Sequence, residues 1–375
     1  MNIFDYLRWR CDVPFSAAPF NLADNLILSE LIYTDFGGIV PEDGRQIELK
    51  EACSRFFTLH DRDEISARKS YTARAPFLME SMLQGSRFSS LRLSRYHAVI
   101  DKDLTTQFAA ITFHLSDGTD YVAFRGTDGT VVGWKEDFLL SYRSGTTGQQ
   151  EAAAYLDTAA MATACPLRVG GHSKGGNLAV YAAVFCRPET LRRIVKVYTN
   201  DGPGFRSEVT SLPAYRGVMP LTVSVVPDTS VIGLLLKNDC ERVVVRSTAS
   251  GITQHDGFSW ETTRDGFVPA SISRTAEIIQ KAISHWVEGL DDETLQSLVD
   301  SVFTLIEATG EDTFHSMSQQ KLKTAEAMIL AMRGLPWEKQ KELLSVTAQL
   351  LQSGGTAVTK TITFRNNQNA TTAEE

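Results

Sequence analysis

One segment, residues 166–183 (PLRVGGHSKGGNLAVYAA), constrains the fold of this chain more than any other. A short apolar run leads into the pattern G-x-S-x-G, with Ser173 between Gly171 and Gly175, and an alanine-rich helical stretch follows. A strand that turns sharply into a helix at a serine is typical of a nucleophile elbow at the carboxyl edge of a sheet. Glycines fit there because a Cβ would collide with the neighbouring strand or helix. This context favours a nucleophilic Ser173 over a glycine- and serine-rich turn without chemistry.

The segments around this elbow alternate between strand and helix patterns. Residues 107–115 and 121–124 flank the turn Ser116–Thr119 and predict a β-hairpin. Short buried strands that alternate with helices predict an α/β domain with a largely parallel sheet. The further strands are expected at 167–170, 194–199, 221–226 and 242–247, and the helices at 149–164 and 176–186.

Both ends of the chain carry helical patterns and no catalytic constellation. Residues 1 to about 90 predict helices, clearest at 21–36 with Asp24 as a cap, and less regular at 65–83. We therefore expect an α/β domain over residues 1–262, with a helical N-terminal segment, and a helical C-terminal region with a polar tail over 263–375. In that second region, amphipathic stripes lie at 272–286, 295–306 and 343–351, and a strand (VTKTITF) precedes the end.

Composition excludes several classes of protein. The net charge is −8, so the chain lacks the broad positive field that non-specific nucleic-acid binding needs. The five cysteines are scattered without zinc-ligand spacing, which indicates reduced thiols and neither a metal nor an organic cofactor. Charged residues interrupt the N-terminal sequence MNIFDYLRWRCD, and the longest apolar run, 178–186, is too short to span a bilayer. We expect a cytoplasmic protein without a transmembrane segment.

A nucleophilic serine needs a base that is held by an acid. In this kind of fold the chain order is serine, acid, histidine, and the histidines after Ser173 are His255, His285 and His315. His255 lies in a glycine-bearing loop after the last predicted strand, where the base belongs. His285, on an amphipathic helix, and His315, among polar residues, are more typical of surface or packing positions. We interpret His172, next to the nucleophile, as a packing residue.

Two aspartates compete for the role of the acid. Asp228 follows the predicted strand 221–226 directly, in VVPDTSVIG, and Asp201 follows the strand 194–199, in TNDGPGF. Both occupy loops at the expected catalytic edge. Asp228 comes one strand later and is closer in sequence to His255, so we predict a hydrogen bond between Asp228 and His255. The alternative for Asp201 is a turn aspartate before Gly202.

An oxyanion hole requires two backbone N–H groups near the nucleophile. One is expected from Lys174, directly after Ser173, and the other from Thr127 in the segment AFRGTDG. Arg125, in the same segment, is interpreted as a structural ion-pair former with Asp137 rather than as a catalytic residue.

The order of these motifs resembles that of the class-three lipases. AFRGT, then W-x-x-D at 134–137, GHSKGGNLA, GPGF and VVPD follow one another as they do there. The chain is more similar to the bacterial Mbeg-like family of α/β-hydrolases, through its opening segment, GHSKGGNLAVYAA, NDGPGF and QHDGFSW, over roughly residues 1–262. This resemblance implies an α/β-hydrolase fold with a serine hydrolase site and supplies no substrate. Lys174 departs from the apolar residue that lipases usually carry there.

The leading hypothesis for function is a serine hydrolase that cleaves a carboxylic ester or thioester through an acyl-enzyme. The same residues would support acyl transfer to an acceptor other than water, and the fold alone would support a non-catalytic binding or scaffold protein. The substrate would be a small-molecule or lipid-like acyl compound. The acidic net charge, the lack of a secretion signal and the Lys174 charge beside the nucleophile favour short-chain or soluble substrates over a lipid surface.

Overall fold

The computed structural model describes most of the chain as two compact units, Met1–Ile272 and Ser273–Glu375. The division between them comes after residue 272, whereas the sequence placed it after residue 262. The stripe at 343–351, the C-terminal strand, the W-x-x-D motif, His285 and His315 lie outside the described residues. The described residues are 1–68, 70–101, 106–127, 135, 145–274, 276–277, 280, 292–309 and 321–341.

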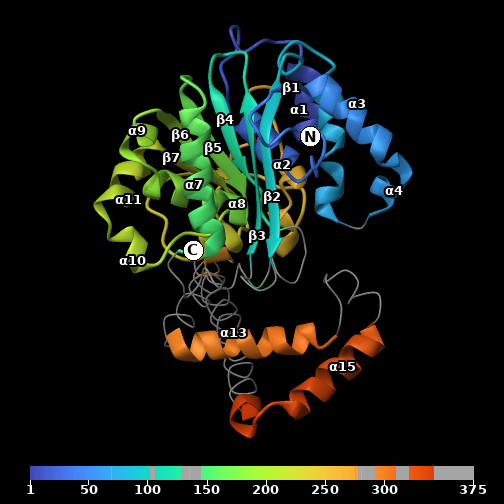
Figure 1. The fold of residues 1–375 in the computed structure, drawn as a ribbon, viewed down its shortest axis with the longest axis vertical. Coiled ribbons are helices and arrows are strands. Elements are labelled where there is room, and N and C mark those ends of the chain that lie inside the picture. The colour runs from blue at the N-terminus through green and yellow to red at the C-terminus, as the bar shows by residue number, and fades with distance from the viewer. Residues whose placement is uncertain are drawn as a thin grey trace, which may run out of the picture. The chain divides into compact units, whose positions relative to one another are not determined.

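The first unit is built on one 8-stranded sheet whose strands follow one another in chain order. The strands from β1 to β4 pair antiparallel, and those from β4 to β8 pair parallel (Figure 1). A mostly parallel sheet of this kind agrees with the predicted fold class. The strands are β1 (Ile47–Glu48), β2 (Arg92–Asp101), β3 (Thr106–His114), β4 (Asp120–Phe124), β5 (Leu167–His172), β6 (Ile194–Asn200), β7 (Thr222–Pro227) and β8 (Glu241–Val245).

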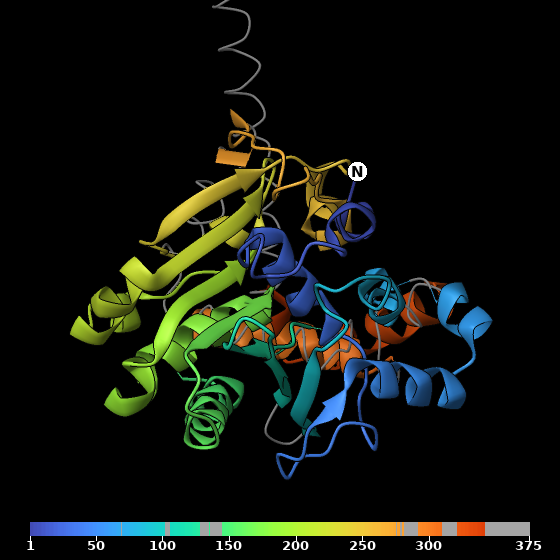
Figure 2. The ribbon, with the colours of Figure 1, turned by 90° about the horizontal axis from the view of Figure 1, so that it is seen from above.

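Helices cover both faces of this sheet, because its strands carry apolar side chains on both sides. In β4, Tyr121 and Ala123 pack into one buried cluster, whereas Val122 and Phe124 pack into the other. Figure 2 shows the blue N-terminal helices on one face and the green helices on the opposite face. The first set includes α1 (Ile3–Arg10), α2 (Leu22–Leu31), α3 (Leu49–Leu59) and α5 (Phe77–Met82), and the second α7 (Thr147–Met161), α8 (Lys174–Phe185) and α11 (Pro213–Val218).

These layers form an α/β-hydrolase fold with helical additions, as the sequence predicted. The predicted hairpin is confirmed, since β3 and β4 pair antiparallel around a turn in which Gly118 has a φ of 82°. The predicted parallel strands and their helices are confirmed within a few residues. The shorter helical elements are α4 (Arg62–Ala67), α9 (Pro188–Leu191), α10 (Ser207–Thr210), η1 (Tyr71–Arg74), η2 (Met219–Leu221), η3 (Ile232–Leu234), η4 (Gly251–His255) and η5 (Gly257–Ser259).

Two expectations for the N-terminal helices need correction. The expected helix at 21–36 ends earlier, as α2. Asn21 caps it, and the Asp24 carboxylate accepts a hydrogen bond from the Asn21 backbone N–H. The stretch 65–83 is not one helix, because α4, η1 and α5 divide it. Pro76 precedes α5, and a proline cannot continue a helix from the residues before it, since it lacks the N–H.

The start of α2 is fixed by a fully buried ion pair. The Arg87 guanidinium and the Asp24 carboxylate meet through two hydrogen bonds, and the side chains of both residues are 0% exposed. Arg87 also donates to three backbone carbonyls, and the Tyr6 hydroxyl donates to Asp24 at 3.0 Å. A buried guanidinium with this many acceptors fixes several chain segments around one point.

Among the described residues of the second unit, the regular elements are helices. The stripe at 295–306 is confirmed as α13 (Asp292–Glu307), and α15 (Lys321–Gly334) follows it. The Lys339 ammonium donates to the Ser297 hydroxyl at 2.8 Å, which joins the two ends of this unit's described part. Among the helices described in either unit, none combines the length and the apolar character that crossing a membrane requires.

Candidate active site

The G-x-S-x-G segment forms a sharp turn between β5 and α8. Ser173 has φ 58° and ψ −129°, a conformation that residues with a side chain adopt only under strain. The turn is tight, because a Cβ on Gly175 would overlap the carbonyl oxygen of Phe124, and one on Gly171 would overlap Gly175. The Ser173 backbone N–H donates to the Asn200 carbonyl of the neighbouring strand at 2.9 Å. This is the geometry of a nucleophile elbow.

The structure brings Ser173, His255 and Asp201 into one line of hydrogen bonds. The distance from Ser173 Oγ to His255 Nε2 is 2.8 Å, and that from His255 Nδ1 to Asp201 Oδ2 is 2.7 Å. The Ser173 residue is 7% exposed, the His255 side chain 18% and the Asp201 side chain 1%. A serine, a histidine and a buried aspartate in this arrangement can activate the hydroxyl as a nucleophile.

The predicted contact between Asp228 and His255 is wrong, and the sheet register explains why Asp201 makes it instead. His172 at the end of β5 is paired with Asn200 at the end of β6, so the next residues, Ser173 and Asp201, leave the sheet side by side. Asp228 follows β7, one strand farther from the nucleophile. Its carboxylate accepts a hydrogen bond from Thr229 at 3.3 Å.

The segment VVPDTSVIG holds the Asp201 carboxylate in place. The second oxygen of Asp201 accepts a hydrogen bond from the Ser230 hydroxyl and another, at 3.0 Å, from the Gly233 backbone N–H. These donors stabilise an ionised carboxylate. The Asp201 backbone has a φ of 49°, and its N–H donates to the Val225 carbonyl of β7 at 2.7 Å. Residues after β7 therefore contribute donors to the site, where the sequence analysis expected the acid itself.

The two expected oxyanion donors are both placed near the elbow. Lys174 is the first residue of α8, and the first N–H groups of a helix have no acceptor within the helix. Thr127 is buried in the loop after β4, next to Gly126. A Cβ on Gly126 would come within 3.1 Å of Ser173 Cβ, so this loop lies against the nucleophile. The Arg125 backbone N–H donates to the Ala109 carbonyl at 2.9 Å, and its expected partner Asp137 lies outside the described residues.

The Lys174 side chain is buried, whereas the sequence analysis treated its charge as an argument against a lipid surface beside the nucleophile. It is 1% exposed, and its ammonium donates to the backbone carbonyl of Gln107 at 2.7 Å and to the Gln107 side chain at 3.0 Å. Gln107 belongs to β3, so this lysine anchors the elbow to the antiparallel part of the sheet. The argument against a lipid surface that rested on this charge is therefore removed.

The loop that carries His255 is held by its neighbours. The indole N–H of Trp260 donates to the Gln254 carbonyl at 2.8 Å, and the Gln254 side chain accepts from the Thr229 backbone N–H at 2.8 Å. Trp260 is fully buried. The segment QHDGFSW thus contains the base together with the tryptophan that fixes the position of its loop.

A polar layer beneath the catalytic residues was missed by the sequence analysis. His172 meets there with Glu30 of α2 and with Tyr33, which lies in the turn after that helix. Burial raises the pKa of Glu30 well above its usual range, and the nearby Asp256 carboxylate acts in the same direction. Burial also lowers the pKa of His172 well below its usual range. Burial thus favours the uncharged form of both groups.

We predict that Glu30→Gln stabilises the protein increasingly as the pH rises. Glu30 has a raised pKa in the folded state, so above about pH 4.5 folding binds a proton, and the stability that Glu30 contributes falls with pH until its folded pKa is reached. A glutamine removes this loss. The stability difference should grow by about 1.4 kcal/mol per pH unit in that interval.

Urea denaturation of both proteins between pH 4 and 8 measures the effect. The contribution of His172 has the opposite sign, because its lowered pKa makes stability rise with pH, and it cancels in the difference between the two proteins. A difference that is constant with pH would show that Glu30 is ionised in the fold.

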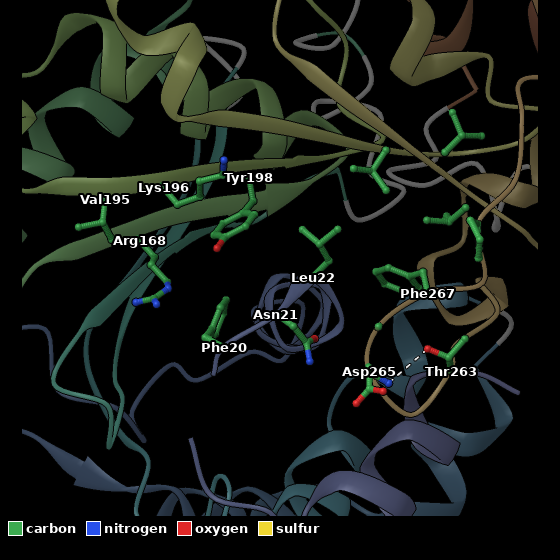
Figure 3. A pocket seen from close by; sticks show the side chains of 15 residues that line it. Phe20, Asn21, Leu22, Arg168, Val195, Lys196, Tyr198, Thr263, Asp265 and Phe267 are labelled. Atoms are coloured by element: carbon green, nitrogen blue, oxygen red, sulfur yellow. Dashed lines mark hydrogen bonds between the residues drawn. The ribbon is translucent and has the colours of Figure 1, made fainter. Parts of the chain in front are cut away.

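A separate cavity of about 680 Å³ opens over the sheet beside the start of α2 (Figure 3). Leu22, at the start of α2, and Phe20, just before that helix, line one side of it. Arg168 of β5 and Tyr198 of β6 also line it. None of the three catalytic candidates lines this cavity. In the part of the chain that the structure describes, no three His, Cys, Asp or Glu side chains are grouped to hold a metal ion.

The chain is similar to one protein family in sequence and to several lipases in structure. The family model described as Mbeg1-like matches residues 82–304, which is more than half of the chain. The search among curated proteins found no match to this chain. The native Rhizomucor miehei lipase–propeptide complex is 17% identical, with 52% of this chain and 68% of that chain covered and a TM-score of 0.33. M37 lipase is 12% identical, with 57% of this chain and 70% of that chain covered and a TM-score of 0.37. Lipase II from Rhizopus niveus is 15% identical, with 50% of this chain and 77% of that chain covered and a TM-score of 0.31.

Proposed function

The chain belongs to the Mbeg1-like family, and we propose that it is a serine hydrolase that cleaves a carboxylic ester or thioester. One observation carries the proposal: the continuous hydrogen-bonded line from Ser173 through His255 to the buried Asp201. The strained backbone of Ser173 supports it, since strain at a buried turn residue is retained only where the surrounding structure enforces it. No such constraint is needed for a binding or scaffold role.

The tautomer of His255 follows from its two partners. The Asp201 carboxylate only accepts hydrogen bonds, so His255 carries its proton on Nδ1 and presents an unprotonated Nε2 to the Ser173 hydroxyl. Nε2 can then remove the hydroxyl proton as Ser173 Oγ forms a bond to the acyl carbon. The Asp201 charge stabilises the imidazolium that results.

The negative charge that develops on the acyl oxygen needs donors that are already in position. The backbone N–H groups of Lys174 and Thr127 are the proposed donors, and the N-terminus of α8 adds the positive end of its dipole. Collapse of the tetrahedral intermediate returns the proton from His255 to the leaving alcohol or thiol. Water, activated by the same Nε2, then releases the acid from the acyl-enzyme.

Labelling with a fluorophosphonate probe tests the proposal. The probe should form a covalent bond with wild-type protein at Ser173, and Ser173→Ala should lose the label completely, because the reaction needs this activated hydroxyl. Ser86→Ala is the matched control, since Ser86 is exposed and bonds only to the Asp12 carbonyl. Wild-type protein without a label, or a label that persists in Ser173→Ala, would contradict the assignment.

A further inference from the structure

We propose that His172 is a positioning residue, which holds the backbone and ring of His255 in register with Ser173 and Asp201. The proposal rests on the serine hydrolase function. The sequence analysis assigned His172 to packing, and the G-x-S-x-G pattern does not specify which residue precedes the serine. Its contacts show a more specific arrangement.

Its two ring nitrogens have different partners, and these fix the tautomer. The distance from His172 Nε2 to the His255 carbonyl oxygen is 2.7 Å. A carbonyl only accepts, so Nε2 carries the proton, and Nδ1 is left as the acceptor for the Tyr33 hydroxyl at 3.2 Å. His172 therefore links Tyr33, in the turn after α2, to the backbone of His255.

The two histidine rings also lie against each other. Their centroids are 4.6 Å apart at an interplanar angle of 36°, and His172 is 0% exposed. The buried Trp260 indole also packs against His172 in an edge-to-face arrangement, with 6.3 Å between the ring centroids and an interplanar angle of 68°. His172 thus limits the rotation of His255 in addition to holding its carbonyl.

The charge state of His172 suits this role. The titratable and charged groups around it are His255, the Glu30 carboxyl 3.7 Å from Nδ1, and, beyond Glu30, Asp256 and Arg74. Burial favours the protonated form of Glu30, which draws a second proton onto His172 less than a carboxylate would. A neutral His172 places no positive charge beside the imidazolium that His255 becomes during the reaction.

His255 needs such a support because of its local structure. It is the last residue of the short 3₁₀ segment η4, and its side chain is partly exposed. Loss of the His172 donor would leave the His255 carbonyl without that bond and loosen the ring relative to both triad partners. Misplacement of a catalytic group by about 1 Å costs on the order of 100-fold in rate.

Two substitutions separate the donor from the bulk of the ring. His172→Phe keeps a ring and removes the donor, and we expect its kcat for ester hydrolysis and its rate of fluorophosphonate labelling to fall by roughly 10- to 100-fold. KM should change by less than about threefold, because His172 does not touch the substrate. His172→Gln, whose amide can donate to the same carbonyl, should recover most of the rate. His97→Phe, at a partly exposed histidine in β2, is the control and should leave both rates unchanged.

The pH profile provides a readout that a general loss of packing would not change. A looser contact with Asp201 stabilises the His255 imidazolium less, so the acidic limb of the kcat/KM profile should move to lower pH in His172→Phe and return in His172→Gln. Near-UV circular dichroism confirms the fold of each variant. Where His172→Phe does not fold, the comparison of wild type with His172→Gln and the following measurement decide the question.

Nitrogen-15 NMR of the histidine rings tests the arrangement without activity. The His172 ring should be neutral at pH 7, with its proton on Nε2, and should stay neutral as the pH falls through the usual range of histidine titration. An Nδ1–H tautomer or a titration near pH 6.5 would overturn the proposal. If the wild type is labelled at Ser173 and His172→Phe is labelled equally fast, this proposal fails alone. If the wild type is not labelled, the serine hydrolase function fails, and with it the positioning role.

Discussion

Asp201→Asn is expected to lower kcat for ester hydrolysis by about 10⁴-fold, the scale of the loss when an asparagine replaces the triad acid in a serine protease. The neighbours of Asp201 determine how the asparagine would lie. Ser230 and the Gly233 backbone N–H donate to Oδ1, so the amide oxygen would stay with them and the amide nitrogen would face His255. The amide nitrogen is a donor, so His255 Nδ1 must become an acceptor and the ring proton moves to Nε2. A protonated Nε2 cannot accept the proton of the Ser173 hydroxyl.

Asp228→Asn is the matched control for this prediction. Asp228 is a half-buried aspartate in the next strand-end loop, and its side chain accepts only from Thr229 among the described hydrogen bonds. Its kcat should remain within a few-fold of wild type. Steady-state kinetics on a chromogenic ester, with far- and near-UV circular dichroism of both variants, measures the contrast. Equal losses in the two variants, or a larger loss in Asp228→Asn, would contradict the assignment of Asp201.

The choice between these aspartates illustrates where sequence reasoning ended. Ser173 and His255 could be predicted because each lies in a local pattern with a clear neighbouring strand. The acid depends on which strand lies beside β5 and on the register that pairs His172 with Asn200. Register depends on contacts across the sheet, so sequence distance from His255 was the wrong criterion.

The residues beneath the site were beyond prediction for a related reason. Asn200 donates to Ser29 at 3.0 Å and to the Gly171 carbonyl at 3.1 Å, and the Asn25 side chain donates to Asn200 at 2.8 Å. These residues join α2 to the ends of β5 and β6 across more than a hundred residues of chain. In the sequence, α2 has the apolar pattern of a packing helix, and its polar positions carry no motif.

Lys174 shows a different limit of the sequence. The sequence analysis noted Lys174 as a departure from lipases, but the direction of its side chain depends on β3, where two oxygens of Gln107 accept hydrogen bonds from the ammonium. A charge in the sequence indicates a surface only where the fold leaves it exposed. The expectation of a short-chain or soluble acyl substrate therefore loses the support of Lys174 and keeps that of the acidic net charge.

Arg87→Met is expected to lower the free energy of unfolding by about 3–5 kcal/mol, because it leaves the Asp24 carboxylate buried without its counter-ion. It also removes the donors to the carbonyls of Val13, Ala18 and Pro19. Arg45→Met is the control, since the Arg45–Asp43 pair is exposed to solvent and should contribute little to stability.

Urea denaturation at pH 7, followed by tryptophan fluorescence, compares these variants with the double variant Asp24→Leu/Arg87→Met. The double variant removes both charges, so it should regain part of the stability that Arg87→Met alone loses, and the cycle isolates the cost of the unpaired carboxylate. The site should respond as well, because Asp24 belongs to the same helix as Asn25 and Glu30, and a displaced α2 would move the polar layer beneath Ser173. An Arg87→Met protein within about 1 kcal/mol of wild type would show that water reaches Asp24, and that the start of α2 is not held by this pair.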